Sequence, residues 1–123
     1  MSGGKRILVI EDTEDNRRII RDLLTNAGYE LLEATTGVEG VQMATDHRPD
    51  LILMDIQLPE MDGYQATRRI REDPACAGIP IIAVTSYALS GDETKTREAG
   101  CDGYVAKPFS PRQLLAKVRE FLT

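Results

Sequence analysis

The sequence has no tryptophan, a single histidine and only two cysteines among its 123 residues. Cys76 and Cys101 lie far apart, without C-x-x-C spacing or a nearby histidine, so we expect reduced thiols and no disulfide framework or thiolate metal site. Long apolar runs are missing too, because the N-terminal segment is polar and the apolar stretch after it covers only residues 7–10. Neither a signal peptide nor a membrane span is therefore predicted, and we expect a cytoplasmic protein.

Clustered positive charge is also absent. The formal net charge is −5, and the basic residues are not grouped closely enough to follow a phosphate backbone, which argues against a nucleic-acid partner. A glycine-rich loop after the first apolar run is missing as well. The acidic segment 11–15 stands in that place and would repel the phosphates of a flavin or dinucleotide.

Short apolar runs alternate with helical patterns along the whole chain, and we expect a single domain over residues 1–123 without an attached output domain. Five strands are predicted, over 7–10, 29–34, 51–54, 81–84 and 103–106. Each is followed by a helix, and the last helix begins at Pro111. This alternation predicts parallel βαβ units with right-handed crossovers, and hence a doubly wound α/β fold of three layers.

Charge and periodicity predict how several elements pack. Two glutamates interrupt the run 29–34, which favours an edge strand. The first helix is expected to bury Ile19 and Ile20, and the third helix to direct its arginines, including Arg71, into solvent. The helix predicted over 91–99 has almost no apolar stripe, which is typical of a weakly packed helix.

Polar side chains follow four of the predicted strands at the points where those strands end. They are Glu11, Asp12, Asp55, Thr85 and Lys107. The carboxyl ends of parallel strands meet at one edge, where open α/β sheets place their ligand sites. Three carboxylates close together repel one another, which raises their pKa values or recruits a cation, and such oxygens suit Mg²⁺. With a hydroxyl and an ammonium group beside them, they predict phosphoryl transfer to a nucleophilic aspartate, Asp55.

Four segments carry a resemblance to a known family: Val9-Ile10-Glu11-Asp12, Asp55-Ile56-Gln57-Leu58-Pro59-Glu60-Met61-Asp62-Gly63, Val84-Thr85 and Lys107-Pro108-Phe109. In this order and at these separations they resemble the response-regulator receiver domain of two-component signalling, over about residues 5–123. The layout is similar to single-domain regulators of cell division and chemotaxis, and to receivers at the ends of hybrid kinases. The resemblance implies a flavodoxin-like sheet with strand order 2-1-3-4-5.

The resemblance also implies a metal-assisted phosphorylation site. Asp55 would take a phosphoryl group from the phosphohistidine of a histidine kinase or a phosphotransfer protein. Asp12 and Asp55, with the Gln57 backbone carbonyl, would hold Mg²⁺, with Mn²⁺ as an alternative ion. Glu11 would support the ion through water.

The remaining implied roles concern the switch. Thr85 and Lys107 would bind phosphoryl oxygens, and Tyr104 would turn inward when Thr85 moves. Two interpretations of the helix over 91–99 stay open: a plain solvated face, or a shifting part of an output surface formed with Tyr104 and the last helix. A downstream protein target would bind there. We expect a monomer, with dimerisation on phosphorylation left open.

Two other functions fit the pattern less well. A phosphatase or phosphotransferase with an aspartate nucleophile usually needs a second carboxylate two positions on, where Gln57 stands, and a substrate cap that no insertion here is long enough to build. A phosphate-independent scaffold would not need the acids, Thr85 and Lys107. The residue after Thr85 is often alanine in the family, and Ser86 is small enough to leave phosphoryl access open. We therefore expect a signalling receiver, not an enzyme with a separate substrate.

Overall fold

The computed structural model describes residues 4–86 and 92–122. Its strands are β1 (Arg6–Ile10), β2 (Glu30–Ala34), β3 (Leu51–Asp55), β4 (Ile81–Thr85) and β5 (Gly103–Ala106). Its helices are α1 (Glu14–Asn26), α2 (Gly37–His47), α3 (Gly63–Glu72), the 3-10 helix η1 (Pro74–Cys76), α4 (Asp92–Ala99) and α5 (Pro111–Leu122). All strand pairs are parallel, in the order β2-β1-β3-β4-β5. The predicted fold class and strand order are confirmed.

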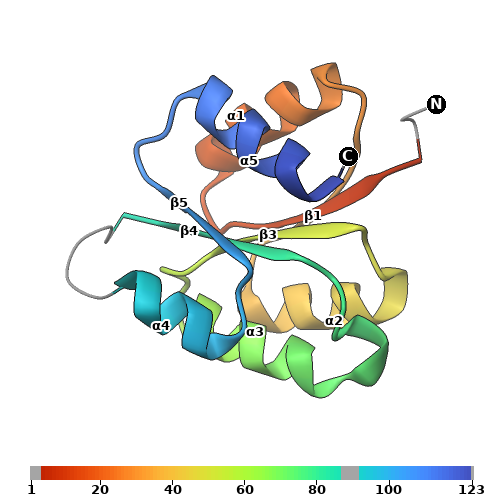
Figure 1. Cartoon of the computed structure of the whole chain (residues 1–123), viewed down its shortest axis with the longest axis vertical. Coiled ribbons are helices and arrows are strands. Elements are labelled where there is room, and N and C mark those ends of the chain that lie inside the picture. Colours follow the sequence, from red (N-terminus) through yellow and green to blue (C-terminus); the bar gives the residue numbers. More distant parts are fainter. Residues whose placement is uncertain (1–3, 87–91, 123) are drawn as a thin grey trace.

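Helices cover both faces of the sheet. In Figure 1, α1 and α5 lie on one face, and α2, α3 and α4 lie on the other. Alternate residues of a strand point to opposite faces, so Ile7 and Val9 pack in the cluster under α1 and α5, whereas Leu8 and Ile10 pack in the cluster under α2 and α3. Because both faces of β1 are covered, its residues 7–10 are all apolar and buried. The acidic strand β2 lies at the edge of the sheet, as predicted.

Ile19 departs from the prediction for the first helix. Its side chain is 55% exposed, whereas Ile20 and Leu24 are the residues of α1 that are buried. Successive residues are about 100° apart around an α-helix, so the stripe that faces the sheet holds Ile20 and leaves its neighbour at the boundary. The prediction that Ile19 belongs to the core is wrong.

Arg71 of α3 is bound to protein groups, not directed into solvent. Its side chain is 19% exposed. Its Nε donates to the Gly100 carbonyl at 2.9 Å, and its Nη1 donates to three carbonyls of the segment 76–79 at 2.7–3.2 Å. Its Nη2 donates to Asp102 Oδ2 at 2.6 Å. The prediction of a solvated Arg71 is wrong because helical periodicity does not reveal carbonyls that loops bring to the helix.

The sparse packing of α4 agrees with the prediction from its composition. Among its described side chains, Thr96 and Ala99 are buried, and the others are exposed. The predicted first residue, Gly91, lies outside the described residues. No described helix combines the length and the apolar character that crossing a membrane requires.

Candidate functional site

Three carboxylates meet at the carboxyl edge of the sheet. Asp55 is the last residue of β3, and Glu11 and Asp12 directly follow β1, its hydrogen-bonded neighbour. The parallel register pairs Ile10 with Met54, so the chain leaves both strands at the same level. One oxygen atom from each carboxylate lies within 4.8 Å of the others. We call Glu11, Asp12 and Asp55 the carboxylate cluster.

Lys107 supplies positive charge to this cluster. Its Nζ lies 3.0 Å from Glu11 Oε1 and 3.5 Å from Asp55 Oδ2. Both carboxylates are nearly inaccessible to water, with Glu11 2% and Asp55 3% exposed, whereas Asp12 is exposed. The Lys107 backbone N–H donates to the Thr85 carbonyl at 2.7 Å, which ties the end of β5 to the end of β4. One ammonium group therefore contacts two of the three carboxylates.

The pKa values of the two buried acids move in opposite directions. Burial and, after it, the negative charge of Glu11 raise the pKa of Asp55 to about 6, although Lys107 and the hydrogen bond from the Gln57 N–H lower it. Burial alone would also raise the pKa of Glu11, but hydrogen bonds from the Thr13 N–H and the Lys107 ammonium lower it overall. Glu11 therefore stays ionised, and Asp55 carries the unfavourable charge.

The donor set fits a hard divalent cation. Mg²⁺ takes oxygen ligands and usually keeps several waters, which suits a cluster with two buried carboxylates and one exposed carboxylate. Burial is the main cause of the raised pKa of Asp55, and a cation there would offset the second cause, the negative charge of Glu11. Gln57 lies next to the cluster, because its backbone N–H donates to Asp55 Oδ1 at 3.0 Å. Its side-chain Oε1 accepts a hydrogen bond from the Ser86 N–H at 3.3 Å.

Gly63 lets the next helix begin directly against Asp55. A Cβ atom at this position would lie 2.5 Å from the Asp55 carbonyl oxygen and 2.6 Å from Ile56 Cα. The Gly63 N–H donates to the Ile56 carbonyl at 3.0 Å. A capping box between Asp62 and Gln65 then starts α3. The loop after Asp55 is thereby held close to the cluster, and only glycine fits at its end.

Thr85 and Tyr104 occupy different surroundings. Thr85 is completely buried at the end of β4, one residue beyond Val84, which pairs with Asp55. Tyr104 is half-buried on β5, opposite Ala83, and does not belong to the carboxylate cluster. It lines a hollow of about 220 Å³ between α4, β5 and α5, and a second of about 410 Å³ against α5.

Sequence reasoning missed an apolar hollow beside Lys107. Its volume is about 420 Å³, and its lining includes Ile19 and Ile20 of α1 with Pro108 and Phe109 of the loop before α5. The exposed Ile19 therefore lines a hollow that Lys107 also lines, and it does not belong to the core. The sequence offers no distinguishing signal for it, because Ile19 stands beside the buried Ile20 just as Leu23 stands beside the buried Leu24.

Comparisons with known proteins agree with one another. The sequence model of the response regulator receiver domain matches residues 7–119. The polar-differentiation response regulator DivK of Brucella anthropi is 42% identical over 118 residues, which are 96% of this chain and 96% of that protein.

Solved structures give the same picture. The receiver domain of a sensor histidine kinase from Pseudomonas aeruginosa PAO1, solved with a magnesium ion coordinated in its active site cleft, has a TM-score of 0.90 at 39% identity. This likeness covers 97% of the present chain and 98% of the kinase domain. The Vibrio cholerae chemotaxis protein CheY4 has a TM-score of 0.91 at 27% identity, over 96% of this chain and 98% of that one.

Proposed function

The chain belongs to the response regulator receiver domain family, and from this premise we propose that it is a phosphorylation-switched signalling module of a two-component system or phosphorelay. Asp55 is the proposed phosphoacceptor. The observation that carries the proposal is the position of Asp55: a buried carboxylate at the end of a central strand, within reach of Glu11, Asp12 and the Lys107 ammonium. We expect a phosphorylated aspartate and no turnover of a separate substrate.

The proposed donor is a phosphohistidine on a histidine kinase or a phosphotransfer protein. A carboxylate oxygen of Asp55 forms a bond to phosphorus while the phosphorus–nitrogen bond breaks, and the electron pair leaves with the donor imidazole. Lys107 and the Thr85 hydroxyl bind phosphoryl oxygens and stabilise the charge that builds up on them. The product is an aspartyl phosphate in place of the charged Asp55 carboxylate.

Asp12, Asp55 and the Gln57 backbone carbonyl are the proposed ligands of Mg²⁺, and Glu11 is proposed to act through a bound water. Mn²⁺ would use the same oxygens. The ion supplies positive charge that offsets both the carboxylates and the incoming phosphoryl group. Because Asp12 is exposed, the entry side of the cluster also stays open to the donor.

The proposed output is a change in protein binding on the face formed by α4, β5 and α5. Thr85 senses the phosphoryl group, and Tyr104 moves inward in response. The hollows on both sides of Tyr104 and the sparse packing of α4 support this assignment, because few buried side chains must rearrange. Hydrogen exchange in α4 should then change on phosphorylation, and an unchanged profile would rule out this output face.

We propose a cytoplasmic protein that is monomeric before phosphorylation and has a downstream protein as its target. The first experiment is intact mass spectrometry after incubation with acetyl phosphate and Mg²⁺. We expect a mass gain of one phosphoryl group in the wild type, and none in Asp55→Asn or in EDTA. If no gain occurs in the folded wild type, and a phosphohistidine donor also fails, the proposal is wrong and the scaffold reading replaces it.

A further inference from the structure

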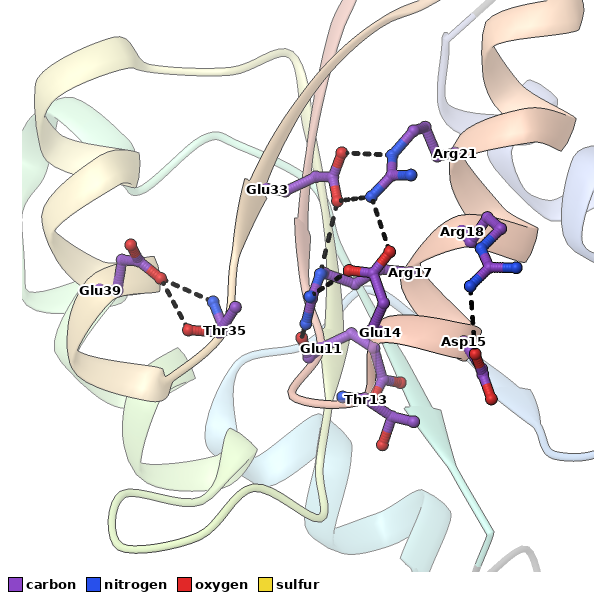
Figure 2. A network of polar contacts seen from close by, with 10 residues as sticks. All are labelled: Glu11, Thr13, Glu14, Asp15, Arg17, Arg18, Arg21, Glu33, Thr35 and Glu39. Atoms are coloured by element: carbon purple, nitrogen blue, oxygen red, sulfur yellow. Dashed lines mark hydrogen bonds and ion pairs between the residues drawn. The ribbon is translucent and has the colours of Figure 1, made fainter.

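Arg17 of α1 is bonded directly to the main chain of the carboxylate cluster. Its Nη1 donates to the Glu11 carbonyl oxygen at 2.8 Å, and its side chain is only 12% exposed (Figure 2). That carbonyl belongs to the peptide unit that joins Glu11 to Asp12. Since a peptide unit is planar, a bond that holds its oxygen also restricts the direction in which Asp12 leaves the strand.

The same turn is held from its other side. The Glu11 N–H donates to the Ala34 carbonyl of β2 at 3.0 Å, and the Thr13 N–H donates to Glu11 Oε2 at 3.0 Å. These bonds place the Glu11 backbone and its side chain. The hydrogen bond from Arg17 differs from these two, because it is made to the carbonyl oxygen of the peptide that links Glu11 to Asp12.

Two glutamates and a second arginine fix the Arg17 guanidinium. Arg17 Nη2 lies 2.6 Å from Glu14 Oε1, and its Nε lies 3.4 Å from Glu33 Oε1. Arg21 binds Glu33 through two hydrogen bonds of 2.7 Å each, as Figure 2 shows, and its hydrogen bond lowers the pKa of Glu33. Together the four side chains carry no net charge. The network therefore orients Arg17 without adding a net positive charge beside a cation site.

We propose that Arg17 is a positioning residue that sets the affinity of the carboxylate cluster for Mg²⁺ by fixing the Glu11–Asp12 peptide. The inference rests on the proposed function, because it assumes that Asp12 and Asp55 bind the ion. Removal of a group that hydrogen-bonds to a metal ligand without contacting the metal typically weakens metal binding by about 10- to 100-fold. Arg17 acts through a backbone carbonyl, so the lower end, about tenfold, is expected.

The test is calorimetric titration of the purified protein with MgCl₂, comparing Arg17→Met with Arg18→Met. Arg18 is the matched control, since it is the next residue of α1, is 59% exposed and pairs only with Asp15 at 3.4 Å among its described ion pairs. We expect about tenfold weaker Mg²⁺ binding in Arg17→Met and wild-type binding in Arg18→Met. Phosphorylation by acetyl phosphate should need correspondingly more Mg²⁺ but reach the same plateau.

A merely structural role would lower stability and leave the Mg²⁺ affinity of the folded protein unchanged, and that result overturns the inference. Arg17→Lys provides the second variant if Arg17→Met does not fold. Lysine keeps the charge but not the planar fork that reaches several acceptors, so its Mg²⁺ affinity should lie between those of the wild type and Arg17→Met. Wild-type affinity in Arg17→Lys would also overturn the inference. If the wild type itself binds no Mg²⁺, the proposed function fails instead.

Discussion

Asp55→Asn is expected to stabilise the metal-free protein. Burial, followed by the charge of Glu11, raises the pKa of Asp55 from its ordinary value of 3.8 to about 6. Folding therefore disfavours the ionised carboxylate. The resulting loss of stability is absent below the pKa that Asp55 has in the unfolded chain. It grows as the pH rises from that pKa to the pKa in the folded protein, and it is complete above the latter. A shift of this size corresponds to an upper limit of about 3 kcal/mol.

The expected gain is smaller than this limit. Asparagine keeps an oxygen that can accept the Gln57 N–H bond, now 3.0 Å long, but it loses the attraction between Asp55 and Lys107. We therefore expect the free energy of unfolding to rise by about 1–2 kcal/mol at neutral pH in EDTA. The gain should shrink with Mg²⁺ present, because the ion stabilises the folded wild type by mass action.

Urea unfolding, followed by circular dichroism in EDTA, measures this difference. Asp12→Asn is the matched control, since it removes a charge from the same cluster at an exposed position and should stabilise the protein less. The advantage of Asp55→Asn should disappear as the pH falls through about 6 towards 4, where the wild-type carboxyl is neutral. A lower unfolding free energy for Asp55→Asn at neutral pH, or a gain that does not depend on pH, would refute this reasoning.

Three further substitutions test separate parts of the structure by urea unfolding. Lys107→Met should cost about 1–3 kcal/mol in EDTA, because it leaves Glu11 buried without its ammonium partner; an unchanged stability would contradict that role. Arg71→Met should cost about 2–4 kcal/mol through the carbonyls that it leaves unpaired, whereas Arg69→Met, at an exposed position, should change stability by no more than about 0.5 kcal/mol. Equal effects of the two substitutions would contradict a stabilising role of the Arg71 hydrogen bonds. Gly63→Ala should cost about 1–3 kcal/mol and slow phosphorylation, because the alanine Cβ would clash with the Asp55 backbone. A normal phosphorylation rate with normal stability would show that the loop can shift to accommodate the Cβ.

The strands and the fold class could be predicted from local patterns. Both faces of β1 and β3 are covered by helices, so residues 7–10 and 51–54 of these strands are all apolar. The two glutamates of β2 fit its place at the edge of the sheet. The strand order did not follow from periodicity and came from the family resemblance, which the structure confirms. The acids and Lys107 could be grouped in advance because parallel strands deliver their carboxyl ends to one edge.

By itself, the sequence determined the alternation of strands and helices, the apolar centre of the sheet and the set of polar groups at its edge. Only the tertiary structure decided the surroundings of Arg71, Arg17 and Ile19. Both arginines bind carbonyl oxygens, one set from loops beyond α3 and one from the end of β1. Every residue has a carbonyl group, so no side-chain pattern marks which carbonyls will lack a strand or helix partner. Which carbonyls lack a partner depends on how the packed elements arrange the backbone. Packing likewise decides whether a residue at the edge of a helix's apolar face, such as Ile19, is buried or exposed.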